Sequence, residues 1–280
     1  MEITQLQNIA TQVRRDIVRM VHAAKSGHPG GSLGCADYLT GLYFEVMNHN
    51  PKFSMDAVGE DVFILSNGHI SPLFYSVLAR SGYFPVKELS SFRNINSRLQ
   101  GHPATHEHLP GVRIASGSLG QGLSVAVGAA LSKKLNNDNS KVFCLTGDGE
   151  LQEGQIWEAL NFAAHHKIDN LIVTIDLNGQ QIDGATKDIM GGEFPMKAKF
   201  EAFGWMVIEM DGNQMTSVVQ ALNRAKSLCG KGKPVAIMMK TEMGAGVDFM
   251  MGSHKWHGIA PNDEQLAAAL SQLPETLGDY

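Results

Sequence analysis

Residues 141–184 constrain the fold more than any other stretch of the chain. A short apolar run over residues 142–145 ends at Gly147-Asp148-Gly149, and a second run over residues 171–175 follows later. Between the two runs, apolar side chains recur at the four-residue interval typical of one helix face: Ile156, Leu160 and Ala164. A strand, a helix and a strand in this order predict a βαβ unit, and therefore a parallel sheet.

Polar residues follow both predicted strands, Asp148 after the first and Asn178 after the second. Ligands of open parallel sheets bind beyond the carboxyl ends of the strands, so we expect these two side chains to lie side by side. Their oxygen atoms suit a hard cation, first of all Mg²⁺, which usually also binds phosphate oxygens. Gly147 and Gly149 would let a bulky anion approach the backbone. Gly147-Asp148-Gly149 alone also fits a plain strand-to-helix turn, with a second turn at Asn178-Gly179.

Composition limits the class of protein. The 280 residues are 43% apolar and 18% charged, enough for one large α/β domain or two small ones. The net charge of −5, without a long run of one sign, argues against a nucleic-acid or membrane-surface partner. We see no charged-then-apolar leader and no apolar run near the roughly 18 residues of a membrane span. Three scattered cysteines lack metal-like spacing, so we expect a reduced, cytoplasmic protein.

Hydrophobic periodicity predicts the other elements. Helices are expected over residues 3–25, 37–47, 71–80, 123–135, 196–203, 215–228 and 262–273. Further strands are expected over residues 62–65, 205–210 and 235–240. Glycine-rich or irregular loops are expected over residues 26–34, 111–122, 185–195 and 241–258.

Four histidines stand in or beside the predicted loops: His28, His69, His102 and His257. A lone loop histidine is most often a solvated polar group. His69, however, follows the strand over residues 62–65, so in a parallel sheet it would share an edge with Asp148. The amides that begin the helix over residues 123–135 could hold an anion, although a glycine-rich turn alone is a weak signal.

Taken in order, these motifs resemble the diphosphate-binding half of transketolase, and in particular the small N-terminal subunit of split, two-gene transketolases. The resemblance runs from about residue 17 onward. It rests on Ser26-Gly27-His28-Pro29-Gly30, Ser66-Asn67-Gly68-His69, Gly101-His102-Pro103, Leu109-Pro110-Gly111, residues 117–122 and 147–154, Asp176-Leu177-Asn178, Ile182-Asp183-Gly184 and Trp256-His257-Gly258.

The resemblance implies the thiamine-diphosphate-binding fold, an α/β fold whose central parallel sheet carries helices on both faces. Residues 1–280 would form a single diphosphate-binding domain. The pyrimidine-binding and C-terminal domains of full-length relatives are missing from this sequence and would belong to a partner chain.

The resemblance also implies the cofactors thiamine diphosphate and Mg²⁺, with Ca²⁺ or Mn²⁺ as substitutes for the metal. Asp148 and Asn178 would bind the metal through their side chains, and Gln180 through its backbone carbonyl. Cofactor contacts are implied for His69, Gly117, Leu119, Gly147, Asp148, Gly149, Glu153, Asn178 and His257.

His28, His69, His102 and His257 would line the substrate channel, and with Glu153 they form the implied catalytic set. Imidazoles suit ketol transfer, because hydroxyl protons must be removed and returned near neutral pH. Glu153 would lie near the subunit boundary and link two cofactor sites, although the helix macrodipole favours a carboxylate at this position anyway. The sequence does not assign a proton-transfer step to each histidine.

The implied protein is the N-terminal subunit of a heteromeric transketolase, an α2β2 heterotetramer that is inactive without its partner. It would transfer a two-carbon ketol unit from a ketose, as a sugar phosphate, to an aldose, and serve pentose phosphates or less usual sugars.

The α subunit of a 2-oxo-acid dehydrogenase shares the Gly-Asp-Gly to Asn pattern but not the histidine loops. A deoxyxylulose-phosphate synthase fits residues 151–154 less well. A non-catalytic, cofactor-binding regulatory paralogue would not need every channel histidine.

Overall fold

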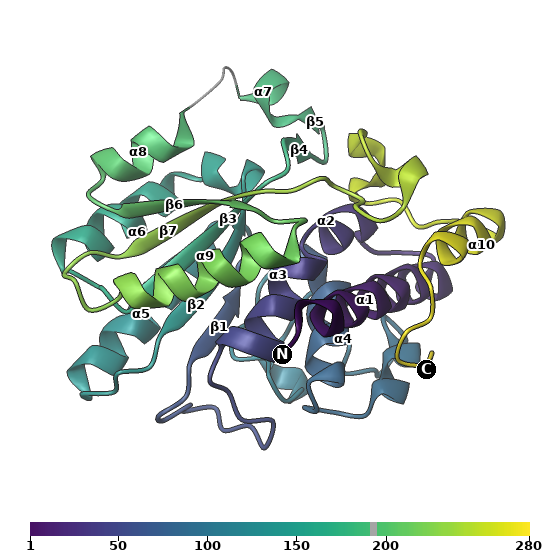
Figure 1. Cartoon of the computed structure of the whole chain (residues 1–280), viewed down its shortest axis with the longest axis horizontal. Coiled ribbons are helices and arrows are strands. Elements are labelled where there is room, and N and C mark those ends of the chain that lie inside the picture. Colours follow the sequence, from purple (N-terminus) through teal and green to yellow (C-terminus); the bar gives the residue numbers. More distant parts are fainter. Residues whose placement is uncertain (191–194) are drawn as a thin grey trace.

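Five parallel strands form the central sheet in the described residues, 1–190 and 195–280 of the computed structural model (Figure 1). The strands lie in the order β1-β2-β3-β7-β6, and each neighbouring pair is parallel. Their bounds are β1 Val62–Leu65, β2 Val142–Gly147, β3 Leu171–Leu177, β6 Met206–Asp211 and β7 Val235–Lys240. The predicted parallel α/β sheet is confirmed, and each expected strand is present within two residues of its predicted ends.

Helices cover both faces of this sheet and bury two separate cores (Figure 1). One face carries α1 Ile3–Ala24, α3 Ala36–Gly41, α4 Ser71–Arg80 and α9 Met215–Leu228. The other face carries α5 Gln121–Leu135, α6 Gly154–His165 and α8 Met196–Ala202. Successive residues of a strand point to opposite faces, so Phe143 joins the first core and Cys144 the second.

Helix α1 shows how the sequence pattern becomes packing. Its apolar side chains recur on one face, where they are fully buried: Leu6, Val13 and Ile17. Asp16 is buried on the same helix and accepts hydrogen bonds at 2.8 Å from Ser76 Oγ and Arg80 Nη2 of α4. This ionic contact ties α1 to α4. Beyond them, α10 Asp263–Gln272 packs on α1, and Asn262 caps its N-terminus.

The expected loop over residues 26–34 is wrong in its second part, because Pro29–Gly34 form helix α2. Pro29 occupies the first helical turn, where a missing N–H costs nothing. The glycines of this helix provide space rather than unusual dihedral angles. A Cβ added at Gly30 would lie 2.8 Å from the carbonyl oxygen of Trp256, and one at Gly34 would lie 3.0 Å from that of Glu242. In this segment only Gly27, before the helix, has a left-handed φ, of 138°.

Two other expectations need correction. The helix expected over residues 37–47 is divided into α3 and the π-helical turn η1 Leu42–Val46. Within and just before the loop expected over 185–195, the structure has the hairpin strands β4 Gln180–Gln181 and β5 Gly184–Ala185 and the short helix α7 Thr186–Ile189. Residues 191–194 of that loop lie outside the described residues. These differences come from tertiary packing, which overrides local preference.

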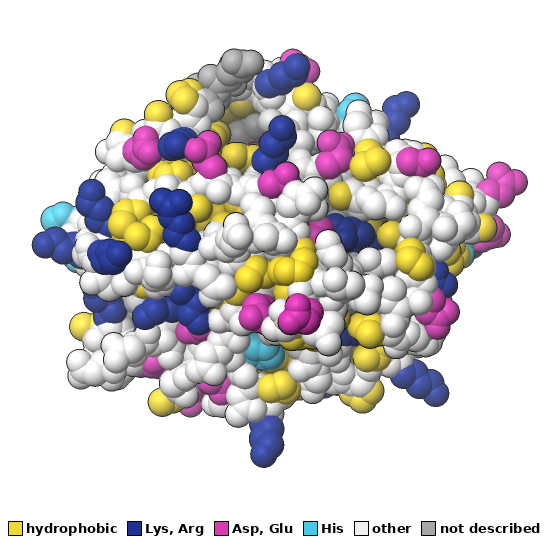
Figure 2. Space-filling model, viewed as in Figure 1, with side chains coloured by type: hydrophobic (Ala, Val, Ile, Leu, Met, Phe, Trp, Pro, Cys, Tyr) yellow, Lys and Arg dark blue, Asp and Glu magenta, His cyan; other side chains and the backbone are white. Residues whose placement is uncertain are grey.

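Short 3-10 turns complete the chain: η2 Gly68–Ile70, η3 Val86–Ser91, η4 Thr105–Glu107, η5 Gly149–Gln152, η6 Asp248–Met250 and η7 His254–His257. Residues 241–258 otherwise stay irregular, as expected. Side chains of both charges occur across the face shown in Figure 2, with hydrophobic side chains between them. Among the helices described here, none combines the length and apolar character that crossing a membrane requires.

Candidate active site

The carboxyl ends of β2 and β3 bring Asp148, Asp176 and Asn178 together. Gly147 pairs with Asp176 across the two strands, so Asp148 lies just beyond the edge of the sheet. Asp148 accepts hydrogen bonds from the backbone N–H groups of Gly149 at 2.8 Å and Gly179 at 2.7 Å. The two predicted metal side chains therefore face one cavity from adjacent strand ends.

The side chain of Asn178 is oriented by its neighbours. Its Nδ2 donates to Asp176 Oδ2 at 2.7 Å, and its Oδ1 accepts the backbone N–H of Gln180 at 2.8 Å. Asp176 is itself buried and accepts a hydrogen bond from the hydroxyl of Thr241. Because a carbonyl oxygen has two lone pairs, Asn178 Oδ1 keeps one lone pair for a further ligand.

A cavity of about 410 Å³ lies at this edge and gathers most of the predicted site residues. Its described lining includes His28, His69, Gly117, Leu119, Gly147, Asp148, Gly149, Glu153, Asn178, Gln180 and His257. These residues come from six separate stretches of the sequence. Of the predicted set, only His102 is missing from this described lining.

The charge of this cavity favours a cation. Its described lining carries five carboxylates and neither Lys nor Arg: Asp148, Glu150, Glu153, Asp176 and Asp183. Burial, and then the neighbouring Asp176, raise the pKa of Asp148 to about 7. A diphosphate would be repelled here unless a divalent cation came with it.

The residues fit a metal that shares its coordination with a ligand. Within the described part of the chain, no group of three or more His, Cys, Asp or Glu could hold a metal ion alone. Asp148, Asn178 and the backbone of Gln180 would supply oxygen ligands on one side, as Mg²⁺ bound to a diphosphate requires. Around the same cavity, three buried polar atoms find no hydrogen-bond partner among the described residues: His28 Nδ1, Asn67 Oδ1 and His257 Nδ1.

The four predicted histidines form one cluster. Ring centroids lie 5.0 Å apart for His28 and His69, 5.6 Å for His28 and His257, and 5.1 Å for His69 and His257. His102 lies at the rim of the cluster, 6.4 Å from His28, and is exposed. A Cβ added at Gly117 would lie 2.8 Å from the His102 ring, so this glycine makes room for it.

These imidazoles favour the neutral form. Burial, and then His257, Arg93 and His102, lower the pKa of His28 to about 4. Burial is also the largest cause that lowers the pKa of His69, His102 and His257. At neutral pH the cluster can therefore accept protons and hydrogen bonds from a polar ligand.

Glu153 lies exposed at the N-terminus of α6 and borders the cavity. The sequence assigned no site role to three further residues that line the cavity: Glu150, which is buried, Gln181 and Asp183. Glu150 directly follows Gly149, so the motif contained it, but only packing shows that it is buried. Gln181 and Asp183 reach the cavity because the unpredicted hairpin β4–β5 turns the chain back over it.

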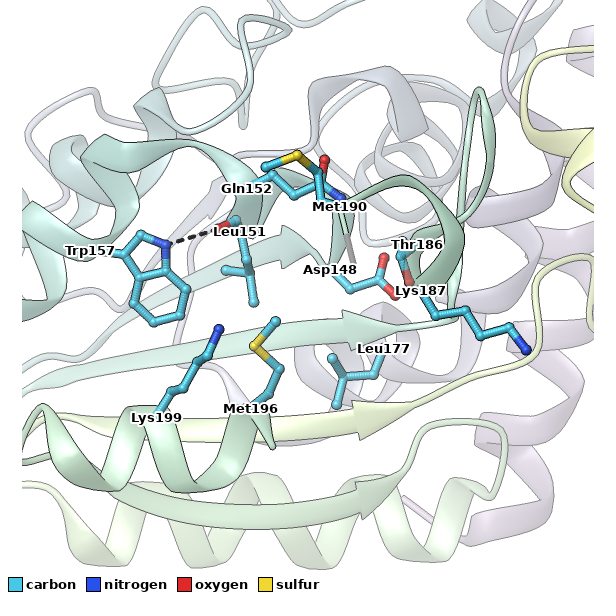
Figure 3. Close-up of a pocket in the computed structure, with 10 residues that line it drawn as sticks. All are labelled: Asp148, Leu151, Gln152, Trp157, Leu177, Thr186, Lys187, Met190, Met196 and Lys199. Carbon is cyan, nitrogen blue, oxygen red and sulfur yellow. Dashed lines mark hydrogen bonds between the residues drawn. The ribbon is translucent and has the colours of Figure 1, made fainter. Parts of the chain in front are cut away.

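A second cavity, of about 360 Å³, also borders Asp148 (Figure 3). Its other walls come from the end of β3, from α6, α7 and α8, and from the turn before α6. Trp157 Nε1 donates to the carbonyl oxygen of Leu151 at 3.0 Å there. The surface is hollowed between α7 and α8 in Figure 2. Asp148 is the one predicted site residue in its described lining, so the histidines and glycine turns favour the first cavity for a cofactor.

The sheet edge, the paired oxygen ligands and the glycine turns define a diphosphate-binding α/β domain of the thiamine-diphosphate class. The sequence matches, over residues 5–275, the family described as "Transketolase, thiamine diphosphate binding domain". The chain therefore belongs to the transketolase family.

Relatives of known name agree with this family. The chain is 40% identical to one of the subunits of the apulose-4-phosphate transketolase of Actinobacillus succinogenes, over 97% of this chain and 96% of that protein. It is 36% identical to a 6-deoxy-6-sulfo-D-fructose transketolase subunit of a Clostridium species, over 96% of each. These relatives support the transketolase prediction over the 2-oxo-acid dehydrogenase and regulatory alternatives.

Solved structures give the same result for the fold. The transketolase of Campylobacter jejuni is 38% identical and superposes with a TM-score of 0.89, over 98% of this chain. The match covers 43% of that transketolase, so the chain spans less than half of the solved protein.

Proposed function

We propose that this chain is the N-terminal, cofactor-binding subunit of a two-chain transketolase. It transfers a two-carbon ketol unit from a ketose to an aldose once its partner is bound. The observation that carries this proposal is one cavity in which the Asp148 and Asn178 oxygens face a cluster of neutral histidines. Ketol transfer requires two things in one cavity: binding of a metal-bound diphosphate, and proton transfer to and from the hydroxyl groups of the sugar.

In this proposal Asp148, Asn178 and the backbone carbonyl of Gln180 hold Mg²⁺, which Ca²⁺ or Mn²⁺ can replace. Gly149, His69 and His257 would contact the diphosphate or the substrate edge of thiamine diphosphate, and Gly117 and Leu119 would border its rings. When bound, the cofactor supplies the nucleophilic carbon that takes up the two-carbon unit. The residues of this chain would orient that cofactor in the cavity.

The histidines then act on the hydroxyl groups of the sugar. Their lowered pKa values keep them neutral, so a ring nitrogen can accept a hydroxyl proton and later return it. His102 stands exposed at the rim, where an incoming substrate would meet it before His28. Glu153, which is exposed beside the cavity, would face a neighbouring subunit.

The partner in this proposal is a C-terminal transketolase subunit that carries the pyrimidine-binding domain, and the assembly is an α2β2 heterotetramer. Two relatives are named as subunits of apulose-4-phosphate transketolases, which supports a second chain. The named relatives act on different sugars, apulose 4-phosphate and 6-deoxy-6-sulfo-D-fructose, so we propose a ketose donor, as a sugar phosphate or a related acidic sugar. We also propose a cytoplasmic location, where such sugars are processed.

The test uses this chain co-expressed with its candidate partner. With thiamine diphosphate and Mg²⁺ present, a panel of phosphorylated and sulfonated ketose donors is assayed with one common aldose acceptor. Either chain by itself serves as the control. We expect ketol transfer by the pair and no turnover by either chain alone, because the cavity is completed only by the partner.

Three results would count against this proposal. Turnover of 2-oxo acids by the pair, without ketol transfer, would move the chain to dehydrogenase chemistry. Cofactor binding without turnover of either substrate class would favour a regulatory role. Turnover by this chain alone would remove the partner from the proposal.

A further inference from the structure

Glu150 is a buried residue to which neither the family resemblance nor the relatives' names assign a role. It lies in turn η5, two residues after Asp148, and only 2% of it is exposed. Its Oε1 accepts hydrogen bonds from the hydroxyl of Ser66 and, at 2.7 Å, from the backbone N–H of Gly120. Its Oε2 accepts the backbone N–H of Gly147 at 3.1 Å. One buried carboxylate thus receives three donors.

The three donors belong to three different walls of the cofactor cavity. Ser66 begins the turn after β1 that leads to Asn67 and His69. Gly120 ends the turn that carries Gly117 and Leu119 and stands at the N-terminus of α5. Gly147 ends β2 beside Asp148. Glu150 therefore connects the wall that carries His69, the wall that carries Gly117 and Leu119, and the wall that carries Asp148.

Close packing couples the same walls. A Cβ added at Gly68 would lie 2.5 Å from Ser116 Oγ and 2.8 Å from the backbone nitrogen of Gly117. A Cβ added at Gly122 would lie 2.6 Å from the Cα of Ser66. With so little space between them, a shift of one wall displaces the next.

We propose that Glu150 is a positioning residue. It sets the distances between the proposed metal ligands, His69 and the turn that carries Gly117 and Leu119. This inference rests on the proposed function, because the cavity must hold the cofactor for the positioning to matter. Glu150 acts through Ser66, Gly120 and Gly147 rather than by contact with the reacting atoms.

The chemistry of the three contacts requires a carboxylate. Both backbone partners are N–H donors, one facing each carboxylate oxygen. A glutamine would fill the same volume, but its NH₂ group would face either Gly120 N–H or Gly147 N–H in any orientation. One buried donor would then lose its acceptor, and the walls would have to separate.

The experiment compares Glu150→Gln with the unmodified two-chain complex. The first measurement is the Kd of thiamine diphosphate at fixed Mg²⁺, well below the melting temperature, so that only folded protein is compared. The second is the Tm of the complex without cofactor. The third is the donor KM at saturating cofactor. Glu264→Gln, at an exposed position of α10, is the matched control.

We expect Glu150→Gln to raise the cofactor Kd about 10- to 100-fold, the range for residues that orient metal ligands. The donor KM should change less than about twofold, and Glu264→Gln should change none of the three values. A merely structural residue would lower the Tm and leave the Kd of the folded complex unchanged. An unchanged Kd in Glu150→Gln overturns the proposal, whatever the Tm.

Ser66→Ala provides a second variant that removes one donor and leaves the carboxylate in place. We expect a smaller rise in Kd, and no further rise when it is combined with Glu150→Gln, because both changes break the same network. If Glu150→Gln does not form a soluble complex, an unchanged Kd in Ser66→Ala overturns the proposal. If the unmodified complex itself binds no thiamine diphosphate, the proposed function fails instead.

Discussion

At the scale of single residues, the site depends on imidazoles that burial keeps neutral. His28 is half-buried and surrounded by His69, His102 and His257, and Arg93 also acts on it. Each of these neighbours would repel a proton on His28 when it is itself charged. Such a cluster keeps its ring nitrogens unprotonated and free to accept hydrogen bonds at neutral pH, and it disfavours the charged imidazolium forms that acid conditions produce.

The pH dependence of unfolding should show this effect. Burial lowers the pKa of His28 to about 4, whereas an unfolded histidine has a pKa near 6.5. Between about pH 6.5 and 4, the unfolded chain therefore binds a proton that the folded chain does not, so the free energy of unfolding falls as pH falls. Between about pH 7 and 5, the free energy of unfolding should therefore fall in both proteins, and the fall should be on the order of 1–2 kcal/mol smaller in His28→Gln than in the unmodified protein.

Urea unfolding followed by circular dichroism at both pH values measures this difference. His106→Gln, at an exposed histidine outside the cluster, is the control and should follow the unmodified protein. Equal losses in His28→Gln and the unmodified protein would show that His28 is not held neutral by the fold.

At the scale of elements, helix α2 carries His28 to the site by packing closely. Gly30 and Gly34 of this helix face the segment over residues 241–258, which also carries His257. The sequence predicted a loop here because glycine and proline usually break regular structure. The helix forms because tertiary contacts compensate for the low helix propensity of glycine.

A pair of glycine substitutions tests this packing. Gly30→Ala places a Cβ 2.7 Å from Met243 Cγ and 2.8 Å from the Trp256 carbonyl oxygen, so we expect a loss of about 1–3 kcal/mol in the free energy of unfolding. Gly128→Ala is the matched control in α5, where no described atom lies within 4 Å of the added Cβ. It should be neutral or stabilising by up to about 1 kcal/mol. Similar effects of both changes, measured by urea unfolding, would contradict close packing of α2.

At the scale of the whole molecule, two cores hold the sheet from opposite faces, and the site lies where the strands end. The edge is left uncovered by the helices that bury the faces. Oxygen ligands, glycine turns and histidines from distant stretches of sequence meet there. A ligand that bridges these walls should stabilise the folded state as a unit.

Cofactor and metal should therefore stabilise the two-chain complex only together. At about 100 times the Kd, bound cofactor adds roughly 2.7 kcal/mol, which corresponds to a Tm rise of several degrees. EDTA, or replacement of thiamine diphosphate by thiamine, should remove this rise, because the acidic cavity accepts a diphosphate only with a divalent cation. Asp148→Asn should remove most of it. A full Tm rise in the presence of EDTA would exclude the metal-linked binding mode.

The sequence by itself determined the parallel sheet and the edge at which the site lies. Strand identity follows from local hydrophobic runs, and a residue that follows a parallel strand must lie at its carboxyl end. For this reason the order of residues alone places Asp148, Asn178 and His69 at one edge. Family-like motifs then added Gly117, Leu119 and His257 to the same prediction.

Only the tertiary structure decided the remaining features. The helical form of residues 29–34, the hairpin over the cavity and the exposed position of His102 depend on contacts between segments far apart in sequence. The role of Glu150 belongs to the same group, because a glutamate in a turn is usually solvated. Its burial and its three donors arise only when β1, β2 and α5 pack together, and no local pattern records that packing.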